Sequence, residues 1–223
     1  MSLIEDIRVL AADVRVRSVN PRDPVHVRTH PDSWRCVGVG NSAAVFQPKD
    51  HPELAIKIYA PEFEDVCATE AGIYEQLGDN EFFPRYYGRG EGFLVIEYRP
   101  GKNLYDCLVQ GVEIPEQAIH DVDTAIAYAQ SRGLNPSDIH VKNVLVHNGR
   151  GHLVDVSDYR ELGDCKRWPD LKSAYYDYYR NLYRPGLTVP SWVLETIRKW
   201  YKSPEGGSSN IGTFAERIIR MFF

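Results

Sequence analysis

Residues 34–98 carry short apolar runs that either alternate with polar positions or continue uninterrupted over the length of one strand. Such runs, bounded by glycine, proline and aspartate, are typical of strands. The pattern predicts two strands around a glycine-containing turn at 34–47, a buried strand at 54–59 and two more strands within 82–98. Between them, residues 62–79 show helical spacing and end at a glycine. This region is therefore expected to hold about five strands and one internal helix.

The residues before this region predict one helix and a connection. Residues 3–17 place apolar side chains at helical spacing, and residues 20–33 are rich in proline. We expect the first segment to be an amphipathic helix and the second to be a loop. The apolar stripe of the expected helix consists of Ile4, Ile7, Val9, Leu10 and Val14.

Beyond residue 99 the pattern is mostly helical. Apolar residues recur at helical intervals in several segments, and glycine or proline lies near their ends. One interruption is an apolar hairpin over 144–156, with the pair Asn148-Gly149 that favours tight hairpin turns. The expected helices cover 103–111, 114–133, 169–185, 190–201 and 213–223, and residues 202–212 are expected to form a flexible loop.

Composition narrows the classes of protein to which the chain can belong. With 223 residues, 43 % of them hydrophobic and 26 % charged, it can bury a sizeable core as one domain or as one domain of two lobes. The net charge of −5 and the pI near 5.8 argue against a mainly electrostatic grip on nucleic acid, local basic patches aside, so we expect no nucleic-acid partner. No apolar stretch reaches the ~20 residues of a membrane span, and the start of the chain does not resemble a signal peptide. The four cysteines are widely spaced and form no metal-binding pair, so we expect a cytoplasmic protein with reduced thiols.

Two glycines lie in the first predicted hairpin. In GVGNSAAVF, Gly38 and Gly40 occupy the first two positions of the pattern G-x-G-x-x-G-x-V, Ala43 stands at the third and Val45 at the last. Glycine lets backbone amides approach phosphate oxygens closely. The segment leads into a second strand and not into a helix, which argues against a dinucleotide-binding fold. By itself the pattern fits a phosphate-binding hairpin or an ordinary hairpin that contains two glycines.

A single charge, Lys57, lies in the buried strand LAIKIY. An ammonium group in such a strand is costly unless it has a partner. A phosphate and an acid from the following helix are the candidate partners, with Glu70 the preferred acid and Glu75 the second. The alternative is that the strand lies at a sheet edge and that Lys57 points into water.

Three polar residues flank the second predicted hairpin. Asp138 and Asn143 come just before it, and Asp155 comes at its end. A hairpin brings its two ends together, so Asn143 and Asp155 can share one cation, and magnesium best matches their hard oxygen ligands. Asp138 lies within the same reach and can accept a proton from an attacking hydroxyl. The alternative is a turn region rich in capping residues.

The order of these features resembles the protein-kinase-like superfamily over about residues 34–160: a glycine hairpin, a strand lysine, a helix acid, D-x-x-x-x-N, and a further aspartate after a hairpin. The resemblance implies an α+β fold of two lobes, with an antiparallel sheet and one helix in the N-lobe and a short helical C-lobe. It implies an N-terminal helix and linker at 1–33, an N-lobe at 34–98 and a C-lobe at 99–223, with ATP and Mg²⁺ between the lobes.

The same resemblance assigns a role to each candidate residue. Lys57, oriented by Glu70, would hold the α- and β-phosphates of ATP, and Asp138 would be the catalytic base. Asn143 and Asp155 would bind Mg²⁺. The glycine hairpin, with Gly38, Gly40, Ala43 and Val45, would cover the phosphates. Residues 96–101 would form the hinge between the lobes, where backbone groups of Glu97 and Tyr98 would meet the adenine.

Several residues depart from the usual kinase pattern. Ser137 stands where an arginine usually precedes Asp138, which suggests that control by activation-loop phosphorylation is absent. His140 takes the place of a lysine, as in RIO-type, lipopolysaccharide-type and aminoglycoside-type kinases, and no Ala-Pro-Glu motif follows Asp155. We therefore expect a compact bacterial kinase that transfers the γ-phosphoryl group of ATP to a serine or threonine hydroxyl of a protein. A small-molecule kinase and a nucleotide-binding pseudokinase are the alternatives.

Overall fold

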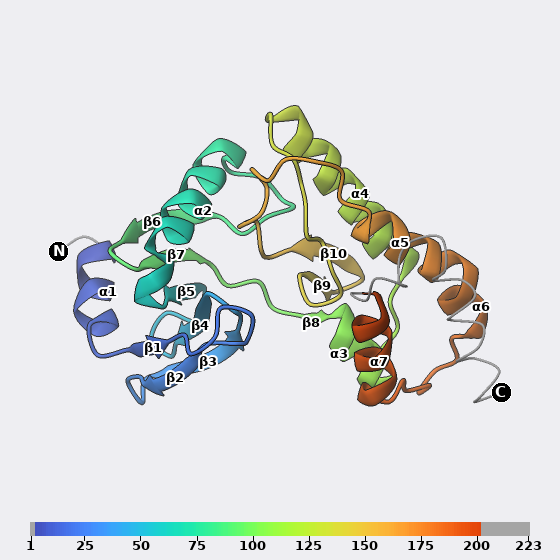
Figure 1. Ribbon diagram of the computed structural model, residues 1–223, viewed down its shortest axis with the longest axis horizontal. Coiled ribbons are helices and arrows are strands. Elements are labelled where there is room, and N and C mark those ends of the chain that lie inside the picture. The colour runs from blue at the N-terminus through green and yellow to red at the C-terminus, as the bar shows by residue number, and fades with distance from the viewer. Residues whose placement is uncertain (1–2, 202–223) are drawn as a thin grey trace. The chain divides into compact units, whose positions relative to one another are not determined.

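The protein is seen here in a computed structural model that describes residues 3–201 (Figure 1). These residues form two compact units. Among the described residues, unit 1 comprises 3–99, 128–135 and 154–160, and unit 2 comprises 100–127, 136–153 and 161–201. The predicted loop at 202–212 and the predicted final helix at 213–223 lie outside the described residues.

The core of unit 1 is an antiparallel sheet of five strands, β3 (Trp34–Val39), β4 (Ala43–Pro48), β5 (Leu54–Tyr59), β6 (Tyr86–Gly90) and β7 (Phe93–Glu97). Their order across the sheet is β3-β4-β5-β7-β6. The strands predicted from the apolar runs are thus confirmed. Because β5 has a neighbour on each side, Lys57 does not lie on an edge strand, and the alternative of an edge lysine in water is excluded.

The register of this sheet places Gly38 and Val45 of the glycine hairpin on the same face as Lys57. Gly38 pairs with Val45, Val45 pairs with Lys57, and Lys57 pairs with Leu94. Because directly paired residues of neighbouring strands project to the same side, these positions form one row across the sheet. Their neighbours along each strand project to the other side, which is apolar.

The apolar face of the sheet is covered by the N-terminal segment, residues 3–33. This segment forms α1 (Leu3–Ala11), β1 (Arg15–Arg17) and β2 (His26–Thr29), and β1 pairs with β2. Figure 1 shows α1 beside β6. Apolar side chains of the segment share one buried cluster with residues of β4, β5 and β7. Its members include Ile7, Val14, Val16 and Val25 from the segment and Phe46, Ile56, Ile58 and Val95 from the sheet.

The prediction of one helix over 3–17 is wrong in its second half. The helix ends at Ala11, and a strand follows in which Val16 is buried between exposed arginines. Val14 and Val16 are buried at a spacing of two, which is the period of a strand and not that of a helix. The partner strand β2 lies within residues 20–33, which the prolines had predicted to be a loop. Two members of the predicted apolar stripe, Val9 and Leu10, are exposed.

The long helix of unit 1, α2 (Glu64–Leu77), follows a 3₁₀ turn at Pro61–Phe63 and ends at Gly78, as predicted. Gly78 has a φ of 65°, a conformation that glycine adopts without strain. The buried residues of α2 recur at helical spacing. They are mostly apolar, but one of them is the carboxylate Glu70. The other buried residues of α2 are Cys67, Ala71, Ile73, Tyr74 and Leu77.

Unit 2 contains the predicted second hairpin and most of the predicted helices. Its strands are β8 (Lys102–Asn103), β9 (Val144–His147) and β10 (Arg150–Leu153), in the order β10-β9-β8. The predicted helix at 169–185 contains a π-helical turn over Tyr175–Tyr179. None of the helices formed by residues 3–201 is long and apolar enough to span a membrane. The helices are α3 (Leu104–Gln110), α4 (Glu116–Ser131, of which residues from 128 onward belong to unit 1), α5 (Arg167–Ala174), α6 (Arg180–Leu182) and α7 (Ser191–Tyr201).

A buried carboxylate on α4, Asp121, fixes the hairpin of unit 2. It accepts hydrogen bonds from the guanidinium of Arg150 at 2.7 and 3.0 Å and from the backbone N–H of Gly151 at 2.9 Å. Gly151 packs so closely on α4 that a Cβ atom there would collide with the carbonyl oxygen of Ala118. The hairpin β9-β10 is thereby held against α4.

Candidate active site

The glycine hairpin is held by backbone hydrogen bonds and has space at both glycines. The Gly40 N–H donates to the Ala43 carbonyl at 2.8 Å, and the Gly40 carbonyl accepts from the Val25 N–H of the N-terminal segment at 2.8 Å. A Cβ atom at Gly38 would lie 3.8 Å from Cβ of Val45. A Cβ atom at Gly40 would lie 3.5 Å from the Ala43 oxygen. These are ordinary contact distances, so the packing of unit 1 does not require glycine at either position.

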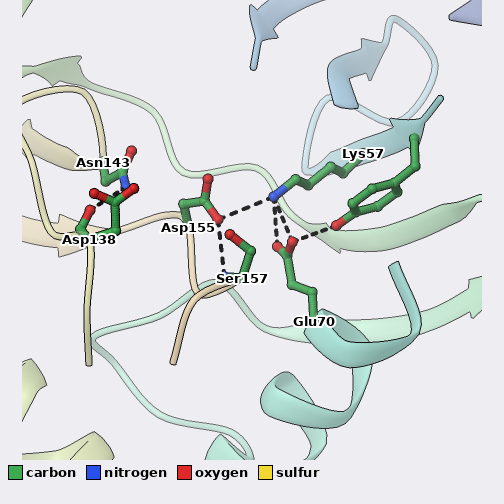
Figure 2. A network of polar contacts seen from close by, with 7 residues as sticks. Lys57, Glu70, Asp138, Asn143, Asp155 and Ser157 are labelled. Atoms are coloured by element: carbon green, nitrogen blue, oxygen red, sulfur yellow. Dashed lines mark hydrogen bonds and ion pairs between the residues drawn. The ribbon is translucent and has the colours of Figure 1, made fainter. Parts of the chain in front are cut away.

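Lys57 and Glu70 form a buried ion pair, which is the contact that the sequence predicts. The Lys57 ammonium lies 2.8 Å from Oε1 and 2.7 Å from Oε2 of Glu70. Figure 2 shows the two side chains, from β5 and α2, directed toward each other. Lys57 is 7 % exposed and Glu70 is 0 % exposed, so water screens this contact little. Removing one partner would leave an unpaired charge in the core, which is strongly destabilising.

Asp155 is the second carboxylate beside the Lys57 ammonium. Its Oδ1 lies 3.3 Å from Nζ of Lys57 and accepts a hydrogen bond from the Ser157 N–H at 3.2 Å (Figure 2). Burial opposes the charge of Asp155, but Lys57 and the hydrogen bonds from Ser157 outweigh it and hold the pKa of Asp155 below its ordinary value. Burial also opposes the charge of Lys57, but Asp155 and Glu70 outweigh it and raise the pKa of Lys57. Unit 1 therefore presents an ammonium and an ionised carboxylate at neutral pH.

The short segment that carries Asp155 is anchored within unit 1. Val156 and Tyr159 are buried, and the Tyr159 ring packs edge-on against Phe83 with the ring centroids 5.9 Å apart. The Asn135 N–H donates to the Tyr159 carbonyl at 2.8 Å. These contacts hold Asp155 beside β5 although the two are far apart in the sequence.

Asp138 and Asn143 lie in unit 2, before β9 (Figure 2). The backbone of Asp138 has a φ of 54°, in the left-handed region that residues other than glycine seldom adopt and that recurs at functional sites. The Asn143 side chain donates through Nδ2 to the Asp138 carbonyl at 3.1 Å. This hydrogen bond uses the nitrogen of the amide and leaves Oδ1 as the acceptor atom of Asn143.

The carboxylate of Asp138 forms an ion pair with Arg167, at the start of α5, which the sequence analysis did not predict. The next residue, Trp168, is buried and donates through Nε1 to Asp123 at 2.8 Å. Lys172 lies 2.5 Å from the same Asp123 carboxylate. These contacts fix the start of α5 and with it the position of Arg167. No motif pointed to this pair, because its two members lie in different segments of the chain.

Tyr59 is another residue that the sequence analysis missed. It lies two positions after Lys57 in β5 and donates its hydroxyl to Oε2 of Glu70 at 2.5 Å. Side chains two positions apart in a strand project to the same face. The alternation of β5 could therefore have indicated that Tyr59 and Lys57 reach the same carboxylate.

The backbone donors at the predicted adenine contact are used within unit 1. The Glu97 N–H donates to the Arg85 carbonyl at 2.8 Å. The Tyr98 N–H donates to the Glu53 carbonyl at 2.7 Å. A contact of these two residues with an adenine base would therefore involve their carbonyl oxygens.

The candidate metal ligands fit Mg²⁺ in their chemistry. Asp155 offers an ionised carboxylate and Asn143 offers an amide oxygen, and Mg²⁺ prefers such hard oxygen donors. Among residues 3–201, no group of three or more His, Cys, Asp or Glu side chains could hold a metal ion by itself. Sparse protein ligation is typical of Mg²⁺ that is held largely by the phosphates of a nucleotide.

The chain is similar to known kinases, although no protein-family model matches it. YrzF of Bacillus subtilis (strain 168), named as a candidate serine/threonine-protein kinase, is 35 % identical over 178 residues, which cover 79 % of this chain and 82 % of YrzF. The serine/threonine-protein kinase RUNKEL of Arabidopsis thaliana is 30 % identical over 113 residues, which cover 48 % of this chain and 8 % of RUNKEL. The kinase domain of PknI from Mycobacterium tuberculosis has a TM-score of 0.44 at 20 % identity, over 56 % of this chain and 60 % of that domain.

These similarities differ in how much of each relative they cover. The chain spans 8 % of RUNKEL and 60 % of the PknI kinase domain, so the activities of those whole proteins are not carried over. The similarity to YrzF, in contrast, extends over most of both chains. On this similarity, the chain belongs to the serine/threonine-protein kinase family.

Proposed function

We propose that the protein transfers the γ-phosphoryl group of ATP, with Mg²⁺, to a serine or threonine hydroxyl of a protein. The observation that carries this proposal is the contact of one buried ammonium, Lys57, with two carboxylates, Glu70 and Asp155. Burying a charge costs stability, and in phosphoryl transfer a buried lysine gains a further partner in the nucleotide phosphates. Membership of the serine/threonine-protein kinase family supports the same reaction.

In unit 1, Lys57 would contact the α- and β-phosphates, and Glu70 would hold its ammonium in place. The glycine hairpin would cover the phosphates. The space at Gly38 and Gly40 supports this role, since packing does not explain the two glycines. The nucleotide contacts of unit 1 would come from Gly38, Gly40, Ala43, Val45, Lys57 and the carbonyl groups of Glu97 and Tyr98.

In unit 2, Asp138 would orient the acceptor hydroxyl and take its proton as the hydroxyl oxygen bonds to the γ-phosphorus. The bond from the γ-phosphorus to the bridging oxygen breaks, and ADP leaves with that oxygen. Asn143 and Asp155 would hold Mg²⁺, which neutralises charge on the phosphates. Because little covalent work falls to the protein, placement and charge stabilisation would determine the rate.

The two compact units would correspond to the lobes of a kinase, except that residues 128–135 and 154–160 pack in unit 1 although they lie within the proposed C-lobe. In this proposal residues 34–98 are the N-lobe, residues 99–223 are the C-lobe, and residues 1–33 are an N-terminal addition to the N-lobe. The buried apolar side chains of the N-terminal segment support its inclusion. The enzyme would be a compact bacterial kinase that works in the cytoplasm, without a nucleic-acid partner.

Labelled ATP tests this proposal. The purified protein is incubated with γ-labelled ATP and Mg²⁺, first with a panel of dephosphorylated proteins and then with hydroxylated small molecules. Label on serine or threonine of a protein, which disappears when Mg²⁺ is chelated, supports the proposal. Label in small molecules alone points to the small-molecule kinase that His140 suggests, and nucleotide binding without transfer points to a pseudokinase. Either of these two results contradicts the proposal.

A further inference from the structure

Tyr59 contacts both members of the Lys57–Glu70 pair. Its hydroxyl donates to Oε2 of Glu70 at 2.5 Å, and the Lys57 ammonium lies 5.5 Å from the centroid of its ring. The side chains of Lys57 and Tyr59 project from the same face of β5, because the two residues are two positions apart in the strand. All three residues are buried, so their contacts are shielded from water.

The hydroxyl of Tyr59 gives the buried Glu70 carboxylate a hydrogen bond, which apolar packing cannot provide. Glu70 is fully buried, so protein groups must replace the water that would otherwise solvate its carboxylate. Lys57 donates to both oxygens, and Tyr59 adds a third hydrogen bond, to Oε2. Burial raises the pKa of Glu70 above its ordinary value, and the hydrogen bonds from Lys57 and Tyr59 act against that shift. Tyr59 therefore helps to keep the carboxylate both charged and fixed.

The hydrogen bond from Tyr59 also ties two elements of unit 1 together. Tyr59 belongs to β5 and Glu70 to α2, so the bond adds a second link beside the Lys57–Glu70 contact. Burial and the nearby Glu70 charge raise the pKa of Tyr59 well above its ordinary value, so its hydroxyl keeps the proton that it donates. Side chains of this protein alone therefore link β5 to α2.

We propose that Tyr59 is a positioning residue for phosphoryl transfer, which fixes Glu70 so that the Lys57 ammonium stays directed at the nucleotide phosphates. This inference rests on the proposed function of Lys57 and adds a residue outside the set that the kinase motifs indicate. It implies that α2 is held against β5 without a bound partner or an activating modification.

Tyr59→Phe tests the inference because it removes the hydroxyl and keeps the ring. We expect kcat to fall about tenfold, the loss typical of removing a group that orients a catalytic side chain, while KM for the acceptor stays unchanged. Tyr74→Phe is the matched control. Tyr74 is buried, lies one turn after Glu70 on α2, and finds no hydrogen-bond partner for its hydroxyl among residues 3–201. Wild-type kcat in Tyr59→Phe, or an equal loss in both variants, would overturn the inference.

A double variant shows whether Tyr59 acts through Glu70. In a Glu70→Gln background, Tyr59→Phe should cause little further loss of kcat, because effects that pass through one shared partner are not additive. The same loss in both backgrounds would overturn the inference. Each rate is measured below the thermal unfolding transition of that variant, followed by circular dichroism, so that loss of fold is not counted as loss of positioning.

Lys57→Ala separates this inference from the proposed function. If folded Lys57→Ala keeps wild-type turnover, the role of the whole cluster in phosphoryl transfer fails. If Lys57→Ala is inactive while Tyr59→Phe is fully active, only the role of Tyr59 fails.

Discussion

Lys57 donates hydrogen bonds to both carboxylate oxygens of Glu70, at 2.8 and 2.7 Å, and so links β5 to α2. A second carboxylate, that of Asp155, approaches the same ammonium at 3.3 Å. One charge in an otherwise apolar strand is therefore held by a helix and by a segment distant in sequence. Charge pairs of this kind contribute little net stability, because desolvation offsets their attraction. Their value in a kinase would lie in the fixed position of the ammonium.

Loss of either charge at this site should remove most of the activity. Lys57→Ala and Asp155→Ala are each expected to lower turnover by at least ~100-fold, the scale of losing one preorganised electrostatic group. Steady-state rates of phosphoryl transfer from ATP, measured on folded protein, give the comparison. Lys49→Ala changes an exposed lysine of the same unit and should retain wild-type turnover. Wild-type rates in both site variants would remove Lys57 and Asp155 from the site.

Alanine at Gly38 or Gly40 should weaken nucleotide binding without destabilising the fold. Both positions have room for a Cβ atom, so the free energy of unfolding should stay the same or rise by about 0.4–1 kcal/mol as alanine restricts the unfolded chain. The added methyl group would stand where the backbone is proposed to approach phosphate. We expect KM for ATP to rise about tenfold, which corresponds to about 1.4 kcal/mol of binding free energy.

The control for the glycine variants is Gly151→Ala in unit 2. There the new Cβ atom would collide with the carbonyl oxygen of Ala118, so the substitution should cost about 1–3 kcal/mol of stability. Chemical unfolding and ATP kinetics together distinguish the two kinds of glycine. An unchanged KM for ATP in both Gly38→Ala and Gly40→Ala would argue against a phosphate-binding hairpin.

The N-terminal segment should stabilise unit 1 as a core element does. Ile7 is 3 % exposed and belongs to the cluster on the apolar face of the sheet, so Ile7→Ala should lower the free energy of unfolding by about 2–5 kcal/mol. Val9 lies on the same helix and is 66 % exposed, so Val9→Ala should change stability by less than about 0.5 kcal/mol. Urea unfolding measures both variants. Equal, small effects would show that α1 does not pack on the sheet.

The hydrogen bonds to Asp121 make part of the stability depend on pH. Burial opposes the Asp121 charge, but the bonds from Arg150 and Gly151 outweigh it and hold the pKa of Asp121 below its ordinary value of 3.8. The ionised form therefore stabilises the folded state above that value, and this stabilisation is lost as the pH falls through the lower pKa of the folded protein.

Asp121→Asn should accordingly cost about 1.5–3 kcal/mol near neutral pH, because the bonds that it weakens are made to a charged group. The difference from the wild type should shrink as the pH falls below 3.8 and through the lower pKa of Asp121 in the folded protein. Urea unfolding of both proteins across this range measures the difference. A difference in stability that persists undiminished at the acid end would show that the charge of Asp121 is not its source.

Local pattern was sufficient to predict the sheet of unit 1 and one contact of the site. The residues of β5 are mostly apolar because the strand is buried, and apolar residues recur at helical spacing in α2 because one side of the helix is buried. Both patterns can be recognised in the sequence alone. Glu70 could be named as the preferred partner of Lys57 because it lies on the helix that directly follows the strand, and the structure shows it on the buried side of that helix.

The remaining contacts depend on tertiary structure, which local pattern does not contain. Val14 and Val16 occupy too short a run to distinguish a strand from the continuation of α1. Arg167 contacts Asp138 because contacts of Trp168 fix the start of α5. The spacing of apolar residues along the sequence does not indicate such a contact. The same holds for Phe83 and Asn135, which fix the segment carrying Asp155, since they come from two other stretches of unit 1.

The most direct test compares phosphoryl transfer from γ-labelled ATP by the wild type and by folded Lys57→Ala, over a range of Mg²⁺ concentrations. We predict that the wild type labels serine or threonine of a protein acceptor only when Mg²⁺ is present, and that Lys57→Ala does so at least ~100-fold more slowly. Equal rates for the two proteins, or no transfer by the wild type at any Mg²⁺ concentration, would contradict the central role given to Lys57.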